Sequence, residues 1–226
     1  MPLTKKMHKK LMDEYDSLLR STGREGIEEL LEWLHGTDFY TAPARAEHGC
    51  SYPGGLLEHS LDVYHCLHEK LIPGASSAWN SIAADPDVTE ESVIISTLLH
   101  DLCKIGIFFV TRVNRKNYDP DVVAKAEKWS VKQDKDGQFI WEAVPGYRLD
   151  ETMPLGRGEK SVILAQRYIR LTDAEMYAIR WHNGFYEADD KWMVSNVMAA
   201  YPLVLGLYEA DLEATYITEK NKLRKA

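Results

Sequence analysis

The feature that most constrains the fold is an uncharged stretch from Ser92 to Leu99, which ends in the polar sequence HDLCK. An uncharged run behind an acidic first turn predicts a helix that is buried on most of its sides. His100 and Asp101 follow directly, and both are costly to bury unless another group compensates them. We therefore expect a central helix that carries a polar site at its end.

The other sequence patterns predict a mostly α fold around this helix. Amphipathic repeats indicate helices over residues 5–20, 26–36, 56–71, 158–171 and 195–217, the last one kinked or divided by Pro202. Another helix is expected over residues 171–184, where Thr172 and Glu175 form a capping box and Gly184 is a candidate C-cap. Aromatic and β-branched runs on both sides of DKDG predict a small β-hairpin insertion at about residues 128–145.

Composition narrows the class of protein. The 226 residues are 45% hydrophobic and 27% charged, which fits one globular domain over residues 1–226. We expect N-terminal helices over residues 1–40 and a helical core over residues 42–216. The net charge of -8 makes extended nucleic acid a poor partner, since such binding neutralises many phosphates. Without an apolar leader, a membrane span or paired cysteines, the chain is expected to be cytoplasmic, with no membrane partner.

The His-Asp pair can be satisfied in two ways. Side chains of adjacent helical residues diverge by about 100°, so His100 and Asp101 converge only on a point beside the helix. A divalent cation at that point would pair the carboxylate and accept an imidazole nitrogen. The alternative is a buried His-Asp hydrogen bond without metal. His59 on a preceding helix and Asp211 on a late apolar helix are the candidate partners for a metal.

Three motifs in order, GGLLEHSLDV, LLHDLCK and EADLEATY, resemble those of the HD-domain metal-dependent phosphohydrolases. That resemblance runs from about Ala42 to Tyr216 and implies an HD-domain helical bundle. PGGLLEHS is most similar to a branch of bacterial HD-type 3'-to-5' exoribonucleases and uncharacterised bacterial and phage hydrolases. The resemblance implies one divalent metal ion, Mn, Fe, Co, Ni, Zn or Mg, and assigns as its ligands His59, His100, Asp101 and Asp211.

The chain departs from the pattern of that branch at two positions. Its members often have a further histidine where this chain has Arg157, and a doubled histidine where it has Trp181 and His182. These departures put a second metal ion in doubt, and whether one binds stays open. The role of His182 stays open between a catalytic contact with the phosphate, a weak ligand and a hydrogen-bonded packing residue.

The implied activity is hydrolysis of a phosphoester or phosphoanhydride of a small nucleotide-like substrate by a metal-activated water. Lys104 would balance charge on the phosphate, and His48 would contact the water or the phosphate; the alternative for each is a solvated side chain. Further phosphate-binding candidates are Arg148, Arg157 and Lys160. With other cations near the hairpin they would form a lid over the nucleotide or a solvated surface; these cations are Arg112, Arg115 and Lys116.

Several alternatives remain open at this stage. The hairpin aromatics Trp129, Phe139 and Trp141 either stack on a base or pack in the protein. The alternative activities are a single-strand phosphodiesterase or 3'-to-5' exoribonuclease, and a nucleotide-binding regulatory protein with little turnover. Sequence patterns do not indicate the oligomeric state.

Overall fold

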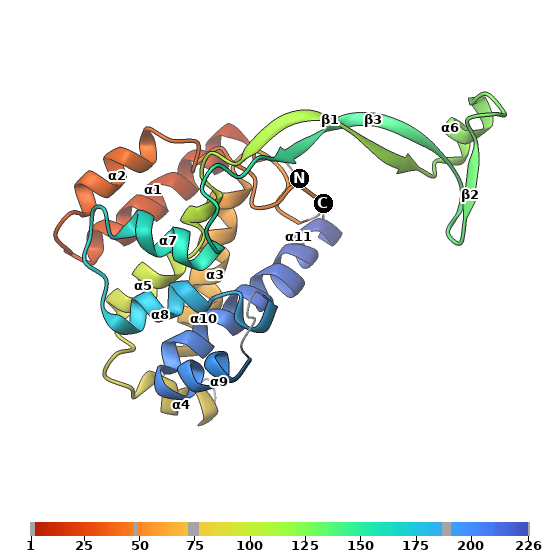
Figure 1. Cartoon of the computed structure of the whole chain (residues 1–226). Coiled ribbons are helices and arrows are strands. Elements are labelled where there is room, and N and C mark those ends of the chain that lie inside the picture. Colours follow the sequence, from red (N-terminus) through yellow and green to blue (C-terminus); the bar gives the residue numbers. More distant parts are fainter. Residues whose placement is uncertain (1–2, 48, 72–76, 187–190, 226) are drawn as a thin grey trace.

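Helix α5 (Glu90–Leu99) lies in the centre of the helical body, as its uncharged sequence predicts. The computed structural model describes residues 3–47, 49–71, 77–186 and 191–225 (Figure 1), and in it every residue from Ser92 to Leu99 is buried. Thr89 caps the helix by accepting a hydrogen bond from the Ser92 amide at 3.0 Å. Helices α3 (Gly55–Leu71) and α8 (Asp173–Trp181) pack directly against α5.

The remaining helices surround this centre and confirm that the fold is mostly α. The Thr172 and Glu175 capping box at the start of α8 is present, and Pro202 divides the last predicted helix into two. The other helices are α1 (Lys5–Ser21), α2 (Ile27–His35), α4 (Ser77–Ala83), α7 (Arg157–Ala165), α9 (Lys191–Ala200), α10 (Pro202–Glu213) and α11 (Glu219–Lys225). Two 3-10 turns, η1 (Leu102–Lys104) and η2 (Gly184–Tyr186), and a π-helical segment, η3 (Ala214–Thr218), complete the described helical structure.

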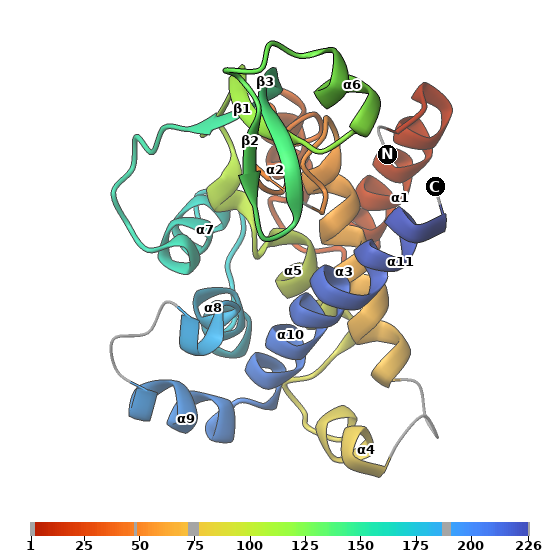
Figure 2. The ribbon, with the colours of Figure 1, turned by 90° about the vertical axis from the view of Figure 1, so that its right-hand side faces the viewer.

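A long β-arm projects from the helical body (Figure 1), and Figure 2 shows the arm nearly end-on. Strands β1 (Phe108–Asn117) and β3 (Gly137–Leu149) pair antiparallel, with Phe108 opposite Leu149. Near the tip, β2 (Lys132–Asp134) pairs with the start of β3, and α6 (Pro120–Lys125) packs on β3. The sheet order is β1-β3-β2. We define the β-arm as residues 108–149.

The β-arm is larger than the predicted hairpin. The turn at DKDG does join β2 to β3, as expected, but β3 reaches Leu149 rather than stopping near residue 145. Its main partner is β1, which lies well before the predicted insertion at 128–145. The difference arises because DKDG determines only the local pairing, whereas the long ladder joins residues 23 (Asn117 and Ile140) to 41 (Phe108 and Leu149) positions apart in the sequence.

Candidate metal centre

Three helical elements bring His59, His100 and Asp211 together. His59 lies on α3, His100 ends α5, and Asp211 lies on α10. One nitrogen or carboxylate oxygen from each residue lies within 4.8 Å of the corresponding atoms of the other two. Both histidines are buried, and the Asp211 side chain is 18% exposed. Two imidazoles and a carboxylate in this arrangement can bind a divalent cation.

The PGG sequence positions the start of α3 and therefore His59. Gly54 has a φ of +83°, a backbone conformation that favours glycine. Gly55 begins the helix so close to the preceding loop that a Cβ atom there would lie 2.0 Å from the carbonyl oxygen of Cys50. The two glycines thus allow the loop before α3 to fold tightly against its first turn.

His100 has an orientation that suits a metal ligand. Its Nδ1 lies 2.7 Å from the carbonyl oxygen of Thr97, and since a carbonyl only accepts, Nδ1 is the donor. In the described part of the chain, Nε2 is buried without a hydrogen-bond partner. It lies 3.3 Å from the Asp101 carboxylate. A cation placed between the ring nitrogen and the nearby carboxylates would satisfy both kinds of group.

His59 is held on both sides by carboxylates. Its Nδ1 donates to Glu219 Oε1 at 2.9 Å, and its Nε2 lies 3.2 Å from Asp211 Oδ1. Burial lowers the pKa of His59, but the hydrogen bonds with Asp211 and Glu219 outweigh burial and raise the pKa to about 9. Burial likewise opposes ionisation of Asp211, yet the hydrogen bond from His59 holds the Asp211 pKa below its usual range.

Asp101 faces the same point but is also paired with Lys104. Its Oδ2 lies 3.5 Å from His59 Nε2 and accepts a short hydrogen bond from Lys104 Nζ. Burial would raise the pKa of Asp101, but the charge of Lys104 and then of His100 hold it well below the usual value. The expected placement of Asp101 on the helix together with His100 is wrong, because α5 ends at Leu99 and Asp101 has φ -106° and ψ 19°. This break lets Asp101 turn towards His59.

The sequence patterns did not predict the residues that support the candidate ligands. Glu219 is 1% exposed, and its second oxygen accepts from Arg45 at 3.1 Å. Arg45 also donates to Thr215 Oγ1 at 3.1 Å, and Thr215 lies 3.4 Å from Asp211 Oδ1. Arg45 thereby connects the partner of His59 to a partner of Asp211. A buried carboxylate on the remote nitrogen of a histidine is a common way to orient a metal ligand.

His182 lies against the cluster in a neutral, hydrogen-bonded state. Its Nδ1 donates to the Ile179 carbonyl at 2.7 Å, and the Asn183 amide lies 2.8 Å from Nε2. Nε2 is 3.7 Å from Asp101 Oδ1. Burial, followed by the neighbouring His100, lowers the pKa of His182 to about 4. His182 therefore combines packing with a position beside the candidate ligands.

A cleft of about 900 Å³ opens beside these residues. His59, Asp101, His182 and Asp211 line it, so the cluster is accessible from one side. Its other lining residues include three cations, Arg45, Lys104 and Arg157, and four aromatic residues, Phe108, Tyr186, Tyr208 and Tyr216. Phe108 and Leu149, the first register pair of the β-arm, also belong to its wall. Cationic and aromatic groups beside the candidate metal ligands suit a small anionic ligand with an apolar part.

The other predicted phosphate-binding residues occupy different places. Lys160 is buried and donates to Glu151 at 2.7 Å, whereas Arg148 is exposed and lies 3.4 Å from Asp150. Neither is among the cleft-lining residues in the described part of the chain. Among the predicted phosphate contacts, the cleft thus includes Lys104 and Arg157, and His48 lies outside the described residues.

The predicted lid over the cleft is not formed by the outer β-arm. Arg112, Arg115 and Lys116 follow β1 away from the body, and only the base of the arm borders the cleft. Phe139 is buried against Trp141 and Tyr118, which is packing, and Trp129 and Trp141 are exposed. These hairpin aromatics are not among the described cleft-lining residues.

Comparisons with family models, with curated proteins and with solved structures found no match to this chain. Among the described residues, every helix is too short or too polar to cross a membrane.

Proposed function

We propose that this protein is a metal-dependent phosphohydrolase that cleaves a phosphoester or phosphoanhydride bond of a small nucleotide-like substrate. The observation that carries the proposal is the convergence of His59, His100 and Asp211 beside a cleft, with the buried His100 Nε2 left without a described partner. The HD motifs support the same assignment and add Asp101 as the fourth candidate ligand.

Each part of the site has a distinct task in this proposal. A bound divalent ion would supply Lewis-acid activation of water and of a phosphoryl oxygen. Lys104 and Arg157 line the cleft and would balance charge on the phosphate. The lowered pKa of Asp101 keeps this carboxylate ionised at neutral pH, which suits a ligand or an orienting acceptor better than a general base.

Activity with defined metals tests the proposal. Purified protein would be stripped and reloaded in turn with manganese, cobalt, nickel and magnesium, and incubated with nucleotides and short RNA and DNA oligomers. Asp211→Ala and Asp101→Ala remove candidate ligands, whereas Glu213→Gln alters a carboxylate on the same helix that pairs with Lys70 instead. We expect metal-dependent product from wild type and Glu213→Gln only.

The products also distinguish the alternative functions. Release of nucleotides from oligomers, with steep loss of activity in salt, would indicate a single-strand phosphodiesterase. Metal retained without product would indicate a binding or regulatory protein. Wild-type protein that retains none of the tested metals would overturn the metal centre itself.

A further inference from the structure

The β-arm exposes apolar side chains that its own fold does not cover. Residues opposite one another in an antiparallel pair share a face, and side chains alternate along each strand. By the register of β1 and β3, Val110, Trp141 and Leu149 therefore lie on one face of the arm. They are 79%, 53% and 48% exposed. A two-stranded ribbon with such a face is only marginally stable in water on its own.

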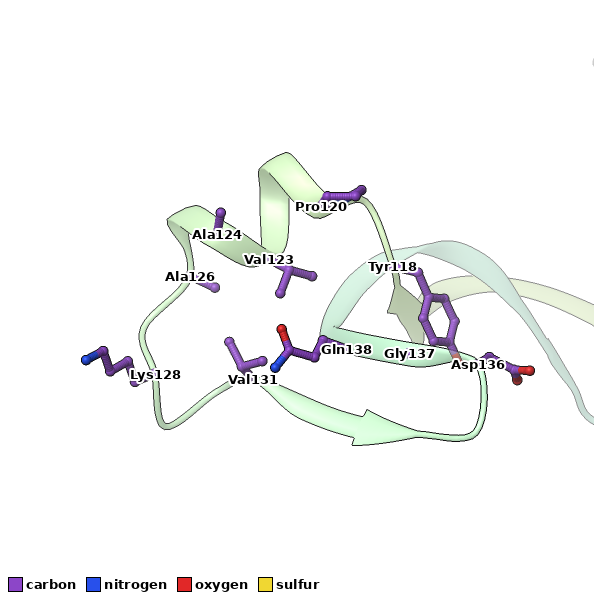
Figure 3. Close-up of a pocket in the computed structure, with 10 residues that line it drawn as sticks. All are labelled: Tyr118, Pro120, Val123, Ala124, Ala126, Lys128, Val131, Asp136, Gly137 and Gln138. Carbon is purple, nitrogen blue, oxygen red and sulfur yellow. The ribbon is translucent and has the colours of Figure 1, made fainter.

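The tip shows that the arm is a built element rather than a loose loop. Val123 on α6 is buried to 9% exposure and Phe139 on β3 to 5%. A hollow of about 680 Å³ lies between α6 and the β2–β3 hairpin, and Val123 and Val131 point into it from opposite sides (Figure 3). The tip thus has its own small apolar core, and the hollow presents a further apolar surface.

Charge makes the body of a second copy a suitable partner for the arm. Residues 108–149 contain 8 Lys and Arg and 6 Asp and Glu, a net charge of +2, while the whole chain carries -8. The rest of the chain therefore carries -10 and attracts a positively charged segment. Single-stranded nucleic acid fits this arm less well, because acidic residues are interspersed among the few cations that would neutralise phosphates.

The helical body also exposes an apolar row on its C-terminal helix. Leu212, Tyr216 and Ile217 are 39%, 59% and 55% exposed, and their spacing places them near one another on α10 and η3. We call these three residues the C-terminal row. It offers apolar area to the exposed face of the arm, and Lys220 Nζ lies beside it, 5.2 Å from the centre of the Tyr216 ring. The attraction for the positively charged arm therefore comes from the net charge of the whole body and not from residues next to the row.

Size permits reciprocal contacts between two copies. The 13 residues of β3 span about 40 Å, and a body of about 180 residues has a diameter of about 40 Å. A stable interface buries about 1,600 Å² in total. A twofold dimer makes each contact twice, so each of the two contacts between an arm and a body needs to bury only about half of that total.

We propose that the β-arm mediates homodimerisation by placing its Val110, Trp141 and Leu149 face on the C-terminal row of a second copy. The arrangement is reciprocal, so each copy contributes one arm and one row. Leu149, Leu212 and Tyr216 also line the cleft, so the contact borders the candidate metal centre. It is still tested separately from the proposed activity, because its readout is molecular mass and neither Val110 nor Ile217 lines the cleft.

Sedimentation velocity of the full-length chain over a range of concentrations tests this contact. The wild type is expected to dimerise, and Val110→Glu and Ile217→Glu each to weaken association by about 100-fold, because the dimer contains every substitution twice. Met7→Glu is the matched control, since Met7 is a 53% exposed apolar residue on α1. It is expected to dimerise like the wild type. Circular dichroism and thermal unfolding check that all variants remain folded.

A mixture of Val110→Glu and Ile217→Glu tests which surfaces meet. In a mixed dimer, the intact arm of the Ile217→Glu copy faces the intact row of the Val110→Glu copy, so one of the two contacts is restored. Stronger association in the mixture than in either variant alone supports the arm-to-row contact. A monomeric wild type, full dimerisation of both variants, or absence of rescue in the mixture would each overturn the proposal. A wild-type monomer that binds single-stranded oligonucleotide in a strongly salt-dependent manner would overturn it in favour of nucleic acid.

Discussion

Glu219→Gln tests whether the buried carboxylate behind His59 contributes to metal binding. The substitution preserves the size of the side chain and an oxygen that can accept from His59 Nδ1, but it removes the negative charge. In the structure this charge faces His59 at 2.9 Å and Arg45 at 3.1 Å, with Glu219 1% exposed. An uncharged acceptor makes the ring of His59 a weaker donor to a metal and orients it less firmly.

The magnitude follows from the strength of this hydrogen bond. A hydrogen bond to a charged group contributes about 1.5–3 kcal/mol, and a bond between neutral groups about 0.5–1.5 kcal/mol. The loss on metal binding is therefore about 1–2 kcal/mol, at about 1.4 kcal/mol for each tenfold change in affinity. Together with poorer orientation of the ring, we expect metal affinity to fall by about 10- to 100-fold.

Competition with a metal-binding dye measures the affinity directly and does not require a substrate. Glu213→Gln is the control, because it makes the same substitution on α10 at a carboxylate that pairs with Lys70 near the surface. We expect Glu213→Gln to bind metal like the wild type. If Glu219→Gln also kept wild-type affinity while remaining folded, the contact between Glu219 and His59 would have no part in metal binding.

Three further outcomes follow from the same geometry. The pKa of His59 is raised to about 9. In metal-free protein its ion pairs should therefore add up to about 3 kcal/mol to the free energy of unfolding below pH about 6.5, and this contribution should disappear as the pH rises through about 9. Urea unfolding across this pH range measures the change. Metal binding at pH 7 should release about one proton from His59. Calorimetry in buffers of different ionisation enthalpy detects this release as a binding heat that differs between buffers. Equal heats in all buffers would contradict the prediction. Gly55→Ala should lower the free energy of unfolding by about 1–3 kcal/mol, because its Cβ would lie 2.0 Å from the Cys50 carbonyl oxygen, and chemical denaturation measures the loss.

Local sequence rules predicted the parts of the fold that depend on neighbouring residues. The uncharged run of α5, the Thr172 capping box and the DKDG turn each depend on residues a few positions apart, and the structure contains all three. Strand β1 was not predicted. Its sequence FFVTRVNRKN is rich in polar residues, and its pairing with β3 spans a long segment of the chain. Such a strand is defined by its partner more than by its own pattern.

The candidate site, like the fold, was predicted only in part. His59, His100 and Asp211 were named from their motifs, and the structure brings them together. Sequence spacing did not predict that α5 ends before Asp101, nor that Lys104 would bind Asp101 directly. The place of Asp101 as a fourth metal ligand remains a prediction. The predicted phosphate contacts were the least reliable part of the site, because the sequence does not show the direction in which the β-arm and its basic residues extend.

The C-terminal helix explains why Glu219 could not be found from spacing. Glu219 follows Asp211 by eight residues, and at about 100° per residue a regular α-helix would turn it about 80° away from the face of Asp211. The π-helical segment η3 lies between them. Its wider turn rotates the chain less for each residue, and so returns Thr215 and Glu219 towards the side of Asp211. One continuous helical element thereby presents a candidate ligand, a hydrogen-bond partner of that ligand and the carboxylate that holds His59. Because π-helical segments are frequent at functional sites, this local departure from α-helical geometry supports the proposal that the cluster binds a metal ion.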